Sequence, residues 1–340
     1  MERQYMKIGK ISESVLKRSV LKQIKTKRDE IKNGAGVGGD CAVFALSDSA
    51  AAGCAAAACV VFRPSDAARA VVRCANNLAA GGAEPLAVMM TLLLPENVEE
   101  AEIRALMEQA EGACSMLNIQ IAGGHTEISG AVNRPVVTMT GLGKALSRQA
   151  VPQTGSFLNR ACPGQDIVIS KWIGLEGTAL LAESRRESLL SRYPTYFVEE
   201  AACFDRYLSI VPEAAVAVKS GVCAMHDASV GGIFAALWEL AECAGVGLSI
   251  DLKKLPIRQE TVEVCEHCGV NPYQLLSGGC LLMTSQDGPG LVRALEAAHI
   301  PAVMAGKITE GHDRIVYNED EIRYLDRPKS DEIYRFYGMS

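Results

Sequence analysis

Ile121-Ala-Gly-Gly-His-Thr-Glu-Ile128 and Met225-His-Asp-Ala-Ser-Val-Gly-Gly-Ile233 are the two segments that decide how this sequence is interpreted. Each joins a short apolar run to a polar, glycine-rich corner. Glycine has no Cβ, so the backbone N–H groups of such a corner can approach an anion closely. A helix that begins just beyond the corner supplies further free N–H groups. The sequence therefore predicts two phosphate-binding corners, one in each half of the chain.

A third glycine-rich segment, Gly34-Ala-Gly-Val-Gly-Gly-Asp40, lies near the N-terminus and adds four glycines and a carboxylate. It differs from a P-loop, because no Gly-Lys-Ser/Thr follows it. Its glycines at positions 36, 38 and 39 are candidates for backbone contacts with a phosphate.

Length and charge narrow the class of protein. A chain of 340 residues is long enough for two domains with full cores. The net charge of −6 excludes a broad nucleic-acid-binding surface. Seven Lys and Arg residues lie between Lys17 and Lys32, where apolar residues recur at helical spacing. We expect them to form the solvated face of an N-terminal helix, with contact to a partner or a phosphate as the alternative.

We expect a cytoplasmic protein whose twelve cysteines are reduced thiols, because no secretory leader is evident. The first residues, Met1–Lys7, lack the apolar core of a secretory leader. The alanine-rich run 50–62 is too short to cross a bilayer, so no membrane association is expected. Cys265-Glu-His-Cys268 has metal-like spacing but lies in an expected helix without a second ligand pair. A packing role is favoured over zinc or redox chemistry.

Strand-like and helix-like patterns are mixed along the whole chain, which favours an α+β fold over a doubly wound one. The turn-rich stretch 147–164 is the expected domain boundary. In the first half we expect strands at 41–46, 59–62, 86–94, 119–122 and 135–142, and helices at 65–80 and from a cap at Asn97 to about 117. In the second half we expect strands at 166–170, 221–225, 246–250, 279–284 and 302–306, and helices near 178–187, 198–208, 231–244, 260–268 and 289–298.

Several blocks resemble the AIR synthase superfamily of ATP-using enzymes, and most of all its hydrogenase-maturation, HypE-like branch. No single block is specific, but they run in family order from about residue 34 to residue 335. They are Asn76-Asn-Leu-Ala-Ala-Gly-Gly-Ala-Glu-Pro85, Gly123-Gly-His-Thr-Glu127, Gln165-Asp-Ile-Val-Ile-Ser-Lys171, Ile173-Gly-Leu-Glu-Gly-Thr178, His226-Asp-Ala-Ser-Val-Gly-Gly232, Ser277-Gly-Gly279 and Arg327-Pro-Lys-Ser-Asp-Glu-Ile-Tyr-Arg335.

The resemblance implies two α+β domains at residues 1–150 and 151–340. The N-terminal domain would carry a mixed sheet that pairs with that of a second subunit into a β-barrel bearing the nucleotide clefts, so a homodimer is expected. A hydrogenase-maturation partner protein is also implied. Carried over by position, His125 and Asp227 are candidate catalytic residues, and Asp40 and Asp227 are candidate metal ligands. The candidate nucleotide-binding residues are Gly36, Gly38, Gly39, Asn76, Asn77, Gly123, Gly124, Thr126, His226, Gly231 and Gly232.

The chain departs from the family pattern where acidic residues would hold magnesium on the ATP phosphates. Neutral residues replace them at Cys41, Asn77 and His125, and the run 50–61 lacks the expected Thr-Asp pair. Amide, thiol and imidazole groups suit Mg²⁺ poorly, because this ion prefers hard oxygen ligands. Mg²⁺ is therefore not expected to bind in the family manner, whereas the glycine corners can still hold a phosphate.

Two hypotheses on function stay open. One is an ATP-dependent enzyme of AIR-synthase type acting on an amide, a carboxylate or a small metabolite. The other is a non-catalytic relative that binds a nucleotide, a phosphate-bearing metabolite or a protein partner. The dehydratase of the HypE branch uses a C-terminal cysteine, whereas the last cysteine here is Cys280. Since that reaction needs a mobile thiolate, we expect no carbamoyl transfer to this chain.

Overall fold

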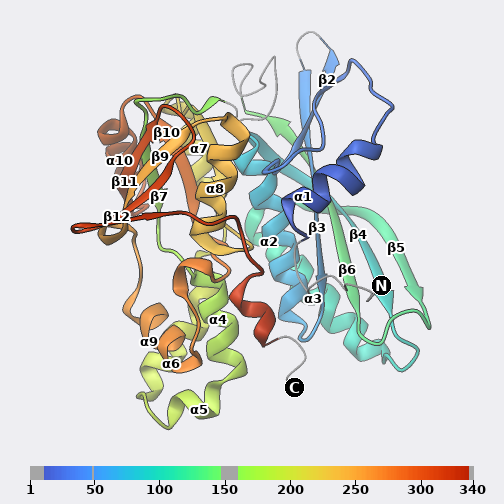
Figure 1. The fold of residues 1–340 in the computed structure, drawn as a ribbon. Helices are drawn as coiled ribbons and strands as arrows, with labels where there is room; N and C mark the ends of the chain where they lie inside the picture. Colours follow the sequence, from blue (N-terminus) through green and yellow to red (C-terminus); the bar gives the residue numbers. More distant parts are fainter. Residues whose placement is uncertain (1–10, 48–49, 147–159, 337–340) are drawn as a thin grey trace, which may run out of the picture. The chain divides into compact units, whose positions relative to one another are not determined.

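The computed structural model describes residues 11–47, 50–146 and 160–336 (Figure 1). Their chain divides into two compact units. The N-terminal unit holds residues 29–34 and 40–146, and the C-terminal unit holds 160–336 together with 11–28 and 35–39. Each unit combines one mixed sheet with helices, so the predicted α+β class is confirmed. The boundary predicted near residue 150 lies outside the described residues and stays a prediction.

The N-terminal unit is built on a six-stranded open sheet in the order β1-β2-β3-β6-β4-β5. Neighbouring strands are antiparallel, except that β4 and β5 are parallel. The strands are β1 (Ile31–Asn33), β2 (Ala42–Ser47), β3 (Ala50–Val60), β4 (Ala83–Leu94), β5 (Gln120–Ile128) and β6 (Val136–Ala145). The two edges of the sheet are β1 and β5.

Two helices, α2 (Ser65–Ala80) and α3 (Glu100–Leu117), form the helical layer of this unit. Alanine-rich α2 packs closely on the sheet, because a Cβ on Gly141 of β6 would lie 2.9 Å from Leu78. The opposite face carries Val60, Leu86, Met89 and Leu142, each between 42% and 50% exposed. No helix among the described residues of this unit covers that face, and we call it the open face.

Strand β3 differs most from expectation, since the predicted strand at 59–62 in fact starts at Ala50 and ends at Val60. Alanine favours helix in isolation, but here β3 is paired with β2 on one side and with β6 on the other. Pairing on both sides of the strand outweighs intrinsic propensity. The predicted cap at Asn97 is also wrong, because Glu99 caps α3 in a reciprocal capping box with Glu102.

The predicted N-terminal helix over residues 17–32 is wrong beyond Gln23. Helical structure spans only α1 (Glu13–Val15), a π-helical turn to Val20 and a 3₁₀ turn to Gln23, while Ile31–Asn33 form β1. Short helices gain most of their stability from packing, and none of residues 13–23 is buried. This segment is tied to the C-terminal unit by Lys17, whose Nζ lies 3.2 Å from Glu242 Oε1.

The C-terminal unit is built on a seven-stranded sheet in the order β13-β12-β9-β11-β7-β10-β8. Only β12 and β9 are parallel. The strands are β7 (Asp166–Ser170), β8 (Ala224–Asp227), β9 (Gly247–Asp251), β10 (Leu281–Ser285), β11 (Ala302–Thr309), β12 (Arg314–Asn318) and β13 (Glu321–Tyr324). The helices are α4 (Leu175–Ser184), α5 (Arg186–Leu190), α6 (Thr195–Ala202), α7 (Val211–Lys219), α8 (Gly232–Ala244), α9 (Gln259–Cys268) and α10 (Gly288–Ala297), with short 3₁₀ turns at Cys203–Tyr207, Leu252–Lys254, Pro272–Gln274 and Glu332–Arg335.

Helix α8 forms the main core with one face of this sheet, where Leu237 and Leu240 pack with Ile167 and Ile169. Val168 lies between these two isoleucines in β7, so its side chain points to the opposite face of the sheet, where it is equally buried. Helices α7 and α10 pack on β7, β10 and β11. A second core joins α4, α6 and α9 and includes Cys265, which is 1% exposed. The predicted packing role of this cysteine is confirmed.

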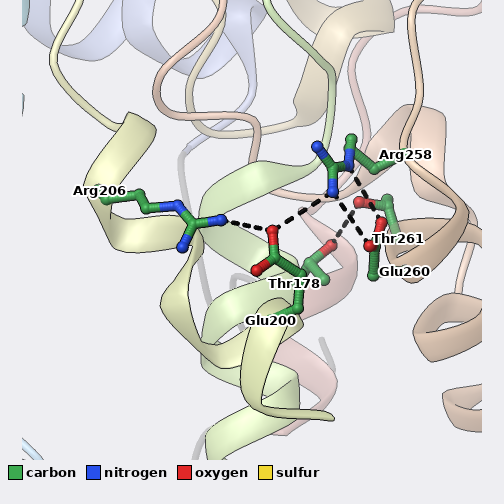
Figure 2. Close-up of polar contacts among 6 residues, drawn as sticks. All are labelled: Thr178, Glu200, Arg206, Arg258, Glu260 and Thr261. Atoms are coloured by element: carbon green, nitrogen blue, oxygen red, sulfur yellow. Dashed lines mark hydrogen bonds and ion pairs between the residues drawn. The ribbon is translucent and has the colours of Figure 1, made fainter. Parts of the chain in front are cut away.

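Arg258 connects the helices around the second core (Figure 2). Its guanidinium donates to Glu260 at 3.0 and 3.1 Å and to Glu200 at 3.3 Å, and Glu200 also pairs with Arg206. Beside this network the hydroxyls of Thr178 and Thr261 are 3.0 Å apart. The network links α6 to the start of α9, and the hydroxyl pair links α4 to α9.

Candidate functional site

The second glycine corner lies where β8 ends and α8 begins, as predicted. Gly231 and Gly232 have φ values of 91° and 70° there. The loop Ser277–Gly279 packs against this corner, because Ser277 N–H donates to Ser229 O at 3.1 Å and Ala228 N–H to Cys280 O at 3.0 Å. We call these two segments, 226–232 and 277–279, the C-terminal corner.

Space as well as conformation requires glycine at this corner. A Cβ on Gly232 would lie 2.5 Å from Tyr273 O and 2.8 Å from Leu275 O. A Cβ on Gly231 would lie 2.6 Å from that of Ala235. Both positions also have the positive φ that other residues adopt only at a cost. The close approach predicted for a ligand is thus made here by the protein's own backbone.

The anion at the C-terminal corner is Asp331, a residue that the sequence analysis did not identify. Its Oδ2 accepts from Gly231 N–H at 2.6 Å, and its Oδ1 accepts from Leu276 N–H at 3.1 Å and from Ile333 N–H at 2.9 Å. The side chain is buried. Burial raises the pKa of Asp331 to about 6, and the nearby Glu176 carboxylate also raises it. The corner therefore binds a carboxylate supplied by the chain itself.

His226 and Asp227 are both 3% exposed at the end of β8. The Nε2 atom of His226 lies 3.1 Å from Oε2 of Glu239 on α8. The sequence gives no signal for this pair, because Glu239 lies 13 residues away in an apolar helix. Cys280 follows the corner and is fully buried, and burial raises the pKa of its thiol. This thiol is therefore not a mobile nucleophile.

A buried ion pair supports the strand beside this corner. Lys171 Nζ lies 2.5 Å from Glu213 Oε1 and donates to the carbonyls of Tyr207 at 2.6 Å and Ser209 at 2.7 Å. Burial raises the pKa of Glu213, and the Lys171 ammonium opposes that shift. Because all three contacts of the Lys171 ammonium are to oxygen atoms, the pair is a structural anchor of β7 rather than a free acid–base group.

The first glycine segment has a different structure from the predicted one. It does not turn after a short strand at 119–122 but continues as edge strand β5 to Ile128, and no helix follows directly. A Cβ on Gly124 would overlap the carbonyl of Met90 on β4, so this glycine allows the two strands to pair. His125 Nε2 lies 3.1 Å from Glu127 Oε2, and both side chains are more than half exposed.

The register of the sheet places His125 and Glu127 on the open face. His125 is paired with Thr91 and Glu127 with Leu93, which alternate with the buried Met90 and Leu92 of β4. Thr126 lies between them and is also exposed. The imidazole and the carboxylate therefore border the apolar surface of the N-terminal unit.

The remaining candidates of the first half are dispersed. Asn76 is 1% exposed within α2, and the Asn77 side-chain amide donates to Ala56 O at 3.4 Å. Gly38 has a φ of 68°, and Gly39 N–H donates to Gly36 O at 3.4 Å in a turn. Asp40 follows that turn at the start of the N-terminal unit's second segment. The structure therefore groups the candidates of the C-terminal corner, whereas those of the first half of the chain lie on separate elements.

Within residues 11–47, 50–146 and 160–336, no three His, Cys, Asp or Glu side chains are gathered closely enough to hold a metal ion. None of the helices in these ranges combines the length and the apolar character needed to cross a membrane.

A mixed sheet with its own helices in each of two units, and a glycine corner at the start of α8, define a two-domain α+β protein of the AIR synthase type. The chain belongs to the AIR synthase related family. The family's N-terminal domain matches residues 38–145 and its C-terminal domain matches residues 163–318. The recognition made from the sequence is thereby confirmed, including its HypE-like branch.

Curated relatives lie in this branch. The carbamoyl dehydratase HypE of Rhodobacter capsulatus is 29% identical over 216 residues, which are 63% of this chain and 60% of the relative. A putative hydrogenase expression/formation protein of Methanocaldococcus jannaschii is 26% identical over 61% of this chain and 58% of the relative. The chain thus spans about three fifths of the length of these relatives.

Solved structures show the same fold. HypE in a HypE–HypF complex superimposes with a TM-score of 0.73 at 18% identity, covering 93% of this chain and 100% of that chain. AaThiL complexed with AMPPCP and TMP gives a TM-score of 0.70 at 20% identity, with coverages of 95% and 99%. HypE in complex with ATP gives 0.69 at 18% identity, with coverages of 85% and 88%.

Proposed function

We propose that this chain is a HypE-like cytoplasmic protein that binds ATP or another phosphate-bearing ligand and has weak or altered ATP-dependent chemistry. The observation that carries the proposal is the match of both family domains in order along the chain. Relatives of the same fold are solved with ATP or AMPPCP. The HypE–HypF complex supports a maturation partner protein for this chain as well. The two proposed domains are residues 1–150 and 151–340.

The residues at the family's metal positions fit Mg²⁺ poorly. Cys41 offers a thiol, His125 an imidazole, and Asn77 an amide, which donates to Ala56 O at 3.4 Å. Mg²⁺ prefers hard, mostly anionic oxygen ligands, which leaves Asp40 and Asp227 as the proposed carboxylate ligands. We therefore assign no step of the reaction to a magnesium ion. In this proposal His125 takes part in the chemistry, and a phosphate that binds at Gly231 and Gly232 displaces the Asp331 carboxylate from Gly231 N–H.

Calorimetry tests the proposal. ATP, ADP and AMP are titrated into the protein with and without Mg²⁺ or Mn²⁺. We expect saturable binding of ATP that strengthens less than about tenfold with Mg²⁺, because neutral side chains leave little metal bridging to the phosphates. A gain of about a hundredfold or more would show that other residues replace the missing acids. Absence of nucleotide binding would favour the alternative, a non-catalytic maturation or scaffold homodimer that binds a protein partner.

The open face predicts a homodimer. It exposes Val60, Leu86, Met89 and Leu142 on three adjacent strands, and contiguous apolar surface of this kind marks interaction sites. We expect a dimeric mass by light scattering at micromolar concentration. The double substitution Met89→Asp and Leu142→Asp should shift the mass to that of a monomer, because two unpaired carboxylates would be buried. A monomeric wild-type protein, or a variant that stays dimeric, would contradict the assignment of this face.

A further inference from the structure

A pocket of about 270 Å³ lies in the C-terminal unit, on the side of α8 where the chain leaves β13. Phe234 and Tyr273 line one part of it, from the first turn of α8 and from the short helix Pro272–Gln274. Residues 323–329 line the other part, as the end of β13 and the segment that follows it. Of the residues proposed above for nucleotide binding or chemistry, only Gly231 lines this pocket.

The apolar part of the pocket is aromatic. The rings of Phe234 and Tyr273 are stacked, with centroids 5.0 Å apart and an interplanar angle of 11°. Tyr324 adds a third ring, which is 65% exposed. Aromatic rings prefer offset-stacked or edge-to-face contact with another ring. The surface is therefore suited to a planar ring more than to an aliphatic chain.

The polar part of the pocket is positively charged. Arg323, Arg327 and Lys329 line it together with one carboxylate, that of Asp326. Lys329 is paired with Asp326 at 2.8 Å, and Arg323 with Glu321 at 2.6 Å. Arg327 makes no ion pair with any residue that the structure describes. Its guanidinium is thus available to bind a carboxylate or a phosphate in bidentate geometry.

The wall that carries these cations is held in place at both ends. Leu325 N–H donates to Arg314 O at 2.8 Å at the end of β13. At the other end, the buried Asp331 accepts the three backbone N–H groups described above. Pro328 further restricts the backbone between these points. A wall fixed in this way needs little ordering when a ligand binds, which favours affinity.

We propose that this pocket binds a small planar aromatic ring that carries one anionic group, a carboxylate or a phosphate. Stacking on Phe234, Tyr273 and Tyr324 would select the ring, and Arg327 would select the anion. The volume is just below the range of about 300–1,000 Å³ that is usual for ligand pockets. It suits a single-ring ligand rather than a nucleoside triphosphate, so the proposal does not depend on nucleotide binding.

The test uses phenyl phosphate and benzoate as the anionic probes and benzyl alcohol as the neutral one, each titrated by saturation-transfer NMR into the full-length protein. We expect both anions to bind saturably, and benzyl alcohol to bind at least about fivefold more weakly because it lacks the charge-assisted bond. The anion that binds more tightly identifies the acid group. Absence of saturable binding of both anions, or equal binding of benzyl alcohol, would overturn the proposal.

Variants locate the binding. Arg327→Ala and Tyr324→Ala should each weaken the tighter probe about fivefold to tenfold. Arg186→Ala is the matched control, because it removes an equally charged, exposed arginine from α5 that does not line the pocket. It should leave the affinity unchanged. An Arg327→Ala variant with wild-type affinity, or an equal loss in Arg186→Ala, would place the binding elsewhere and overturn the assignment.

Discussion

Replacing Gly232 with alanine is expected to lower the free energy of unfolding by about 3 kcal/mol or more. The added methyl group would lie 2.5 Å from Tyr273 O and 2.8 Å from Leu275 O. Both atoms are backbone oxygens, which cannot move aside as the end of a flexible side chain can. The positive φ of 70° adds the strain of a left-handed conformation. Urea denaturation monitored by far-ultraviolet circular dichroism measures the loss.

Gly245 at the other end of α8 provides the matched control. Its φ of 67° is nearly the same, but a Cβ there would meet nothing within 4 Å. Gly245→Ala should therefore cost only the conformational part, about 1 kcal/mol. The difference between the two variants isolates the steric contribution of the C-terminal corner. Equal losses in the two variants would show that the corner can relax and that its packing is looser than the structure indicates.

Replacing Asp331 with alanine is expected to cost about 4 kcal/mol. The substitution would leave three backbone N–H groups, those of Gly231, Leu276 and Ile333, without their acceptor. Asp331→Asn should cost less, because the amide oxygen can still accept from Leu276 and Ile333 while Gly231 loses its partner. Urea denaturation of wild type, Asp331→Asn and Asp331→Ala under identical conditions measures the order of their free energies of unfolding. An alanine variant within about 1 kcal/mol of wild type would contradict this assignment.

The same carboxylate should make stability depend on pH. Burial raises the pKa of Asp331 from its usual value of 3.8 to about 6 in the folded protein. Between these values the folded chain holds a proton that the unfolded chain has released, so the contribution to stability is present at low pH and is lost as pH rises through 6. Relative to Asp331→Asn, wild type should lose up to about 3 kcal/mol between about pH 4 and pH 7. A difference that does not change with pH would contradict the raised pKa.

Much of the fold follows from local signals in the sequence. The apolar run before Pro95 predicts β4, and the Gly-Gly pair after a short strand predicts the start of α8, because each is decided by residues close in sequence. The alanines of β3 carry no such signal. They form a strand because β2 and β6 pair with them from both sides, and long-range pairing of this kind is not encoded in local propensity.

The candidate site could be predicted only in part. The glycine pattern predicts the corner at Gly231 and Gly232, but Asp331, which accepts from Gly231 N–H, lies 100 residues away in sequence. The Ser-Asp-Glu pattern at 330–332 indicates a local cap, which the bond to Ile333 N–H realises, and gives no sign of the contacts with Gly231 and Leu276. The Gly123-Gly124 pair reads like a phosphate corner, yet Gly124 allows β5 to pair closely with β4. The two uses of glycine are alike in sequence and differ only in the partner that lies nearby.

The division of the chain between the units bears on the order of events during synthesis. Residues 11–28 belong to the C-terminal unit, although they are made before any strand of either sheet. Lys17 meets Glu242, which follows it by 225 residues, and Glu242 in turn pairs with Arg314 at 2.6 Å. The N-terminal unit can acquire its sheet while the ribosome is still translating the rest. The first segment must wait until Glu242 and Arg314 have been synthesised before it can reach its place.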